Sequence, residues 1–368
     1  MGLHLIPADL NINFVGFRKI SYAVSILLIL AGVCSLALKG GLRYGIDFAG
    51  GVTAQIHFKA PLSAEELKDS LAGTGLPGLV VQEIGDDGRG YLLRISSVRE
   101  EASSPSALVR EVLDTALKDR VYEISRLEMV GPKVGADLRG KALEALYLSI
   151  LLVSVYISGR FEHRWFTAAC MAGLLGAATY ALGLAGLGKF FLIPVAVVIT
   201  IILCWKLKLV YALGAIVSML HDVLVAVGCF SLLDKEFDLT IIAALLTIIG
   251  YSLNDTIIIF DRIRENLRGD FVSPLGTVIN RSINQTLSRT ILTSGTTLVV
   301  IAALFLLGGD LIHDFALMMG IGVFVGPASS IFVASPVLLI FGGSISRTPP
   351  KKEDRRPRDS DGRLAPQV

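Results

Sequence analysis

Eight long apolar stretches dominate the pattern of hydrophobic and polar positions along the chain. A membrane-spanning helix needs about 20 mostly apolar residues. The stretches that meet this length are 18–38, 141–159, 166–187, 190–206, 209–231, 239–260, 290–308 and 315–342. Only a short turn around Lys189 separates the third from the fourth, so 166–206 is a closely linked pair. The pattern predicts a polytopic α-helical membrane protein with eight spans.

Residues 39–140, between the first two spans, have a different pattern, in which apolar positions alternate and turn signals recur. Alternation predicts strands, and a Ser followed three residues later by Glu predicts a capped helix from Ser63 to Ala72. The expected order is β-α-β-β-α-β, which is that of a ferredoxin-like α+β domain. The predicted strands are 52–58, 79–84, 91–95 and 121–130, and the second helix is 105–118. This scaffold does not by itself indicate a function.

The Lys and Arg residues predict the orientation of the chain, because cytoplasmic loops carry an excess of them. With residues 1–17 in the cytoplasm, the short outer loops hold only Lys189 and Lys235. We therefore expect both termini to be cytoplasmic and 39–140 to be extracytoplasmic. Residues 343–368, rich in Pro, Arg and Asp, read as a disordered cytoplasmic tail. The inner positions are Arg18, Lys19, Arg160, Arg164, Lys206, Lys208, Arg262, Arg264, Arg268, Arg281 and Arg289, followed by Arg347, Lys351, Lys352, Arg355, Arg356 and Arg358 of the tail.

The composition supports a lipid environment and excludes several classes of function. Hydrophobic residues make up 53% of the chain and charged residues 18%, and mean hydropathy is +0.65. The positional bias of the charges argues against a nucleic-acid partner. All four cysteines lie in apolar stretches, which favours core packing over a disulfide or a metal site. The sequence contains no Walker loop, nucleophile elbow or HExxH motif, so we expect neither an enzyme nor a cofactor.

Asp255 and Arg289 are the most informative charges, since an Asp at the centre of a span costs about 2.5–3.5 kcal/mol on insertion scales. Asp255 follows Thr247, Gly250, Tyr251 and Asn254 at helical spacing, and that stripe must face protein or water. Arg289 begins the seventh stretch and keeps its charge. A movable Asp–Arg pair can take up and release a proton. A static buried salt bridge that fixes helix packing is the alternative.

His221 and Asp222 lie near the middle of the fifth stretch. A histidine–aspartate pair at membrane depth indicates a proton relay. It indicates equally well a pair of residues that hold neighbouring helices together by hydrogen bonds. No further ligand stands at metal-binding spacing in the stretch, so no metal site is expected. Gly322 and Gly326 form a GxxxG pair, which permits a close helix crossing.

Several ordered segments along the chain form a distinctive set. They are GIDFAGG at 45–51, VGPKVG at 130–135, His221-Asp222, GYSLNDTIIIFDRIREN at 250–266, NQTLSRT at 284–290 and SSIFVASP at 329–336. On these residues the chain resembles the SecF family, the smaller membrane subunit of the SecDF accessory complex of bacterial protein export.

The resemblance implies a subunit of the bacterial inner membrane, with six family spans, that pairs with SecD and assists SecYEG. YajC is a further candidate partner. Protons would drive the export of unfolded polypeptides, with membrane lipid around the spans. The proton path would include Asp255 and Arg289, with Asn254, His221 and Asp222 as further candidates. The family motif would comprise Gly45, Asp47, Gly50 and Gly51.

The chain departs from the family pattern in one respect. The family passes almost directly from the Arg160-Phe161-Glu162 segment to the helix with His221-Asp222, whereas 166–206 intervenes here as two extra spans. Lipid binding, contact with SecD and simple padding are all open for that pair, and the core of the family is 209–342. Two rival functions also stay open, a proton-coupled small-molecule exporter of this architecture and a non-transporting membrane scaffold.

Overall fold

The computed structural model describes residues 11–74, 79–85, 88–95, 105–117 and 120–342. The predicted disordered tail at 343–368 lies outside the described residues, as do the first ten residues of the predicted N-terminal segment.

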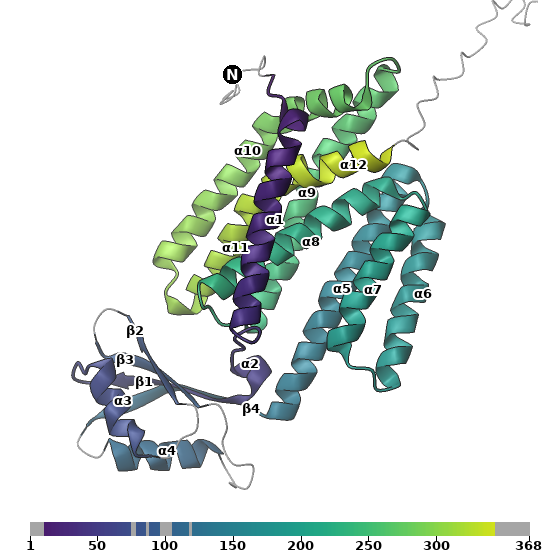
Figure 1. The fold of residues 1–368 in the computed structure, drawn as a ribbon. Coiled ribbons are helices and arrows are strands. Elements are labelled where there is room, and N and C mark those ends of the chain that lie inside the picture. Colours follow the sequence, from purple (N-terminus) through teal and green to yellow (C-terminus); the bar gives the residue numbers. More distant parts are fainter. Residues whose placement is uncertain (1–10, 75–78, 86–87, 96–104, 118–119, 343–368) are drawn as a thin grey trace, which may run out of the picture.

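Most of the chain forms a helical bundle, and eight helical runs in the described part are long and apolar enough to cross a membrane. The eight predicted spans are therefore confirmed. They are α1 (Phe14–Leu38), α5 (Pro132–Glu162), α6 (Trp165–Leu184), α7 (Lys189–Lys206), α8 (Val210–Leu232), α9 (Leu239–Gly269), α10 (Leu275–Leu307) and a last run that starts with α11 (Asp310–Ser329). A small sheet domain lies at one end of the bundle, and the N-terminal end of α1 lies at the other (Figure 1).

Several helices continue well beyond their apolar stretches. The helix α5 starts at Pro132, directly after the last strand, and α9 continues to Gly269. Hydropathy identifies only the apolar part of a helix, whereas the helical backbone continues beyond that part, outside the membrane. Proline suits the first position of α5, because the missing N–H has no partner there in any helix. The sheet is thus joined to the bundle by a rigid connection of one residue, Gly131.

The last span is interrupted, whereas the sequence predicts one continuous stretch at 315–342. After α11 the chain forms a π-helical turn, η1 (Ser330–Ala334), and then α12 (Ser335–Phe341). Pro327 and Pro336 flank this turn, and each lacks the N–H that an α-helix requires. Such π-turns alter the direction of the side chains around them. Here the turn follows Ser329 directly and includes Ser330.

The helices α6 and α7 correspond to the predicted pair at 166–206 and pack against α5, with α7 also touching α8. In Figure 1 they lie on the other side of α5 from α10 and α11. Lys189 at the start of α7 forms an ion pair with Glu144 of α5 at 2.7 Å. The helices α6 and α7 therefore extend one edge of the bundle. The helix α8 with Asp222 and the helix α9 with Asp255 are in direct contact.

The domain consists of β1 (Gly51–Phe58), α3 (Ala64–Ala72), β2 (Val80–Ile84), β3 (Gly90–Ile95), α4 (Pro105–Ala116) and β4 (Tyr122–Val130). The strand order is β2-β3-β1-β4 and every pairing is antiparallel. The predicted β-α-β-β-α-β order is confirmed, and so is the cap of α3, where Ser63 accepts from the Glu66 N–H at 3.2 Å. The ferredoxin-like name stays a prediction. The two helices cover one face of the sheet around a core that includes Ile56, Leu67, Leu71, Leu93 and Leu113 (Figure 1).

Candidate functional site

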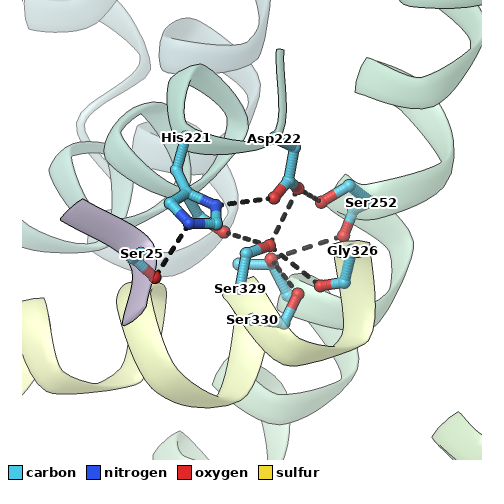
Figure 2. Close-up of polar contacts among 9 residues, drawn as sticks. Ser25, His221, Asp222, Ser252, Gly326, Ser329 and Ser330 are labelled. Carbon is cyan, nitrogen blue, oxygen red and sulfur yellow. Dashed lines mark hydrogen bonds and ion pairs between the residues drawn. The ribbon is translucent and has the colours of Figure 1, made fainter. Parts of the chain in front are cut away.

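Asp222 lies at the centre of a polar cluster inside the bundle, with only 1% of its surface exposed (Figure 2). Its Oδ1 is 3.0 Å from His221 Nδ1, and its Oδ2 accepts from the Ser252 hydroxyl at 2.5 Å. The Ser329 hydroxyl is 2.8 Å from the same Oδ2 and 2.9 Å from the Gly326 carbonyl oxygen, so these two acceptors share one proton. The carboxylate thus has up to three donors.

The cluster extends to four segments of the bundle. His221 Nε2 is 3.0 Å from the Ser25 hydroxyl of α1. If Nδ1 donates to the carboxylate, a neutral imidazole accepts from Ser25 at Nε2. Ser218 donates to Ser329 at 3.0 Å, and Thr256 and Ser330 share a hydrogen bond of 2.7 Å. These bonds join α1, α8, α9 and the end of α11 with its π-turn, which is what a fixed junction of helices requires.

Asp255 lies one helical turn from Ser252 on α9 and is also buried, with 2% of its surface exposed. Among the described residues, it accepts one side-chain hydrogen bond, from the Ser294 hydroxyl of α10, at 3.3 Å to Oδ2. Within the described residues Asp255 forms no ion pair, and Arg289 is exposed on α10. The carboxyl group is therefore enclosed by protein and only weakly bound by it.

Arg289 lines a cavity of about 310 Å³ between α9 and α10, together with Asp261, Arg262 and Glu265. Arg262 pairs with Glu265 at 2.6 Å, and Asp261 pairs with Arg160 of α5 at 2.5 Å. Across this cavity Arg289 therefore lies among charged side chains of α9.

The predicted polar stripe of α9 divides between two environments. Thr247, Gly250 and Asn254 are exposed in this chain, whereas Asp255 points into the bundle. Consecutive residues of a helix differ by about 100° in direction, so Asn254 and Asp255 need not share a face. The Asn254 side chain consequently belongs to the outer surface of α9, beside the Asp255 site.

Glycines allow the helices that carry these groups to approach closely. A Cβ at Gly322 of α11 would lie 2.3 Å from the Ile248 side chain of α9, so the predicted GxxxG crossing is between these two helices. A second close crossing, absent from the sequence predictions, places Gly32 of α1 against Gly228 of α8, where a Cβ would meet backbone at 2.6 Å.

The residues of the Gly45–Gly51 motif form the joint between domain and bundle. Gly50 has φ +77, and a Cβ there would lie 2.9 Å from the Pro132 Cα of α5. Asp47 Oδ2 accepts from the Leu239 N–H, the first of α9, at 3.1 Å. Gly45 donates its N–H to the Phe237 carbonyl at 2.8 Å, just before α9. Gly51 then begins β1. The short helix α2 (Ile46–Ala49) inside this motif was not predicted.

Charged groups extend the joint to the sheet. Glu236, in the loop between α8 and α9, forms an ion pair with Arg94 of β3 and another with Arg43 at 3.5 Å. Asp234 lies in the same loop. The hydrogen bond and the charge of Lys39, and then the charge of Arg43, hold the pKa of Asp234 below its ordinary value. The loop that precedes α9 is thus bound to the domain by both backbone and charge.

The comparisons with known proteins agree over nearly the whole chain. The family profile "Protein export membrane protein SecD/SecF, C-terminal" matches residues 111–197 and 187–344, and the "SecD/SecF GG Motif" profile matches 37–61. The chain belongs to the SecD/SecF protein-export family. Within this SecD/SecF family, the protein translocase subunit SecF of Desulfurispirillum indicum is 35% identical over 354 residues, which cover 95% of this chain and 97% of the relative. That of Magnetococcus marinus is 38% identical, covering 90% and 92%.

A solved structure gives the same result for the fold of this SecD/SecF member. The crystal structure of SecDF from Thermus thermophilus, described as a translocon-associated membrane protein, aligns with a TM-score of 0.64 and 32% identity. The alignment covers 93% of this chain and 40% of the SecDF chain. The family inferred from the sequence motifs is therefore confirmed.

Sequence reasoning found the two carboxylates and His221 but missed most of their partners. Ser25, Ser252 and Ser294 are single hydroxyls in apolar helices, where such residues often bond to their own backbone. Ser329 and Ser330 begin the family segment 329–336. Their hydrogen bonds to Asp222 and Thr256 follow from the position of the π-turn, which the sequence pattern did not predict. Among the described residues no group of three or more His, Cys, Asp or Glu side chains is placed to hold a metal ion.

Proposed function

We propose that this chain is the SecF-type subunit of a SecDF complex in the bacterial inner membrane. It pairs with SecD, assists the SecYEG channel, with YajC as a further contact, and uses the proton gradient to help unfolded polypeptides leave the cytoplasm. The names of its relatives support this assignment. It is a non-catalytic accessory subunit, with the sheet domain outside and both termini in the cytoplasm. The distribution of Lys and Arg supports that orientation.

One observation carries the mechanism, namely the weak pairing of a deeply buried carboxyl group. Asp255 has 2% exposure and one hydroxyl donor at 3.3 Å. An ionised carboxylate without a close counter-ion is costly in such a place, whereas the neutral acid is not. A group in this position changes charge when its surroundings change, which is the property that a proton carrier needs.

Arg289 supplies the change in surroundings. It is exposed on the helix that also carries Ser294, and it faces a polar cavity with Asp261 and Glu265. When Asp255 loses its proton, the guanidinium is attracted toward the carboxylate, and α9 and α10 shift relative to each other. When the proton returns, the attraction ends. Moving one charge through 100 mV is worth about 2.3 kcal/mol, which is enough to bias such a two-state movement.

The joint transmits this movement to the domain. The first N–H of α9 bonds to Asp47, and Glu236 just before α9 pairs with Arg94 of the sheet. A shift of α9 therefore pulls on the Gly45–Gly51 motif and on β3 together. In this mechanism the Asp222 cluster holds α1, α8 and α11 as the fixed frame. We assign His221 and Asp222 to that frame, whereas Asn254, on the outer surface of α9, stays a predicted part of the proton path.

The test is export into inverted membrane vesicles, with and without a proton gradient, for an Asp255→Asn variant. Asparagine keeps the size of the side chain and cannot ionise. Asp137→Asn is the control, since it removes an exposed carboxylate of α5 that lies outside the cavity with Arg289. We expect Asp255→Asn to lose the stimulation by the gradient and Asp137→Asn to keep it. Full stimulation of Asp255→Asn would refute the proposal.

A further inference from the structure

A polar cavity of about 880 Å³ lies at the end of the bundle far from the domain, and the proton mechanism does not use it. Ligand pockets in proteins have about this volume, roughly 300–1,000 Å³. Residues at the start of α1 form one wall, and the first turns of α10, more than 250 positions later in the sequence, form the other. The cavity therefore lies where two helices leave the membrane on that side.

Asparagine side chains hold the two walls together. Asn284 accepts from the Ile12 N–H at 2.9 Å and donates to the Ile12 carbonyl at 2.9 Å. Asn280 accepts from the Val15 N–H at 3.2 Å and also donates to the Ile12 carbonyl, at 3.0 Å. These amide groups hold the chain at the start of α1 against α10, so the two sides of the cavity are fixed relative to each other by hydrogen bonds.

The charge of this cavity is positive. Its lining contains Arg18 and Arg281 and, within the described chain, no Asp or Glu. Arg18 bonds to the Val15 carbonyl at 2.9 Å, and no described acidic side chain forms an ion pair with it. Arg281 is 3.3 Å from Asp270, which stands outside the lining. The backbone N–H of Ser273 is the main cause that holds the pKa of Asp270 below its ordinary value, so Asp270 offsets part of one charge at neutral pH.

Guanidinium groups select phosphate oxygens, because their planar N–H groups match the geometry of the anion. Basic pockets between helices at the membrane boundary bind anionic lipid headgroups. Beside Arg18, the apolar side chains of Phe17 and Ile20 on α1 are 53% and 64% exposed, so an apolar surface for acyl chains adjoins the polar cavity.

We propose that this cavity binds a phosphate group at the membrane boundary, carried by a phospholipid of the adjoining leaflet or by a small soluble phosphate. The ligand holds the start of α1 against α10, and α10 is the helix with Ser294 and Arg289. Lipid composition would therefore act on the stability of the helix pair that encloses Asp255. This site is independent of whether Asp255 carries a proton.

The test measures the melting temperature of the purified full-length chain in a neutral detergent, titrated with three probes. Dioctanoyl-phosphatidylglycerol carries the phosphate and two acyl chains, dioctanoylglycerol has the chains alone, and inorganic phosphate has the anion alone. We expect stabilisation by the first and none by the second. A response to inorganic phosphate as well assigns a soluble phosphate as ligand, and its absence assigns the lipid. Equal stabilisation by dioctanoylglycerol would overturn the proposal.

Three variants sharpen the test. Arg18→Gln should weaken the apparent affinity for phosphatidylglycerol by about tenfold or more, as the loss of one charged hydrogen bond does. Lys19→Gln, the matched control, removes the same charge from the next residue of α1, outside the lining, and should leave the affinity unchanged. Asp270→Asn should raise the affinity, because it frees Arg281. Equal affinities for Arg18→Gln and Lys19→Gln in folded protein would contradict the proposal.

Discussion

Asp222 and Asp255 lie on neighbouring helices and are both almost completely buried, yet their surroundings differ in kind. Asp222 has an imidazole and two hydroxyl groups within 3.0 Å or less, from its own helix and two others. Asp255 has one hydroxyl at 3.3 Å. Burial alone therefore does not identify a working carboxyl group. The number of donors around it separates a residue that fixes helices from one that can change its charge.

The largest effect that tests this comparison concerns stability. Replacing Asp222 by Ala leaves the Ser252 hydroxyl and the His221 ring without their acceptor, whereas Ser329 keeps the Gly326 carbonyl. Unpaired buried groups cost about 1–3 kcal/mol each, so we expect a loss of about 3 kcal/mol in the free energy of unfolding. Asp255→Ala, which removes one long hydrogen bond, should cost about 1 kcal/mol or less. Denaturant unfolding in detergent measures both, and equal losses would remove the distinction between the two sites.

Overpacking the crossing between α9 and α11 should weaken the Asp222 frame without touching either carboxylate. A methyl group at Gly322 would lie 2.3 Å from Ile248, one turn before Ser252 on α9. Gly322→Ala should therefore cost about 2 kcal/mol, as overpacking does. Adding Ile248→Ala should restore part of that loss by making room. Gly173→Ala on α6 is the control, because nothing lies within 4 Å of its Cβ position. A loss as large in this control would show that the effect is not the crossing.

Arg289 tests the other side of the comparison, because an exposed residue can matter for coupling and not for folding. Arg289→Met should change the free energy of unfolding by less than about 0.5 kcal/mol. It should lower gradient-stimulated export about tenfold, which corresponds to a coupling free energy of about 1.4 kcal/mol. Arg268→Met, another exposed cation near the end of α9, is the control for charge. If both variants export equally well, Arg289 has no part in the coupling.

Much of this arrangement follows from sequence, and the reasons for the failures are physical. Long apolar stretches define spans because lipid provides no hydrogen bonds, so the eight spans and the domain between the first two were predictable. The charges Asp222, Asp255 and Arg289 were conspicuous for the same reason. The hydroxyls around Asp222 were not, since Ser in a helix has several uses. Hydropathy also does not report the π-turn between Pro327 and Pro336, because the stretch stays apolar through it.

The smallest expected effect concerns Asp234 in the joint between the domain and the bundle. It is a dependence of the melting temperature on pH. Lys39 and Arg43 hold the pKa of Asp234 below its ordinary value of about 3.9. Its contribution to stability is therefore complete above that value and is lost as the pH falls through the lower folded-state value. Asp234→Asn should lower the melting temperature slightly at neutral pH and not at all in strong acid. A difference that instead disappears between pH about 5 and 8 would mean that another group titrates at the joint.

The most direct test of the central claim is infrared difference spectroscopy of the protein with its partner in membranes, with and without a proton gradient. The carbonyl stretch of a protonated carboxylic acid reports the charge of each buried Asp. We expect the gradient to change one such band, Asp255→Asn to abolish the change, and Asp222→Asn to leave it intact. A band that disappears with Asp222→Asn and persists with Asp255→Asn would contradict the assignment.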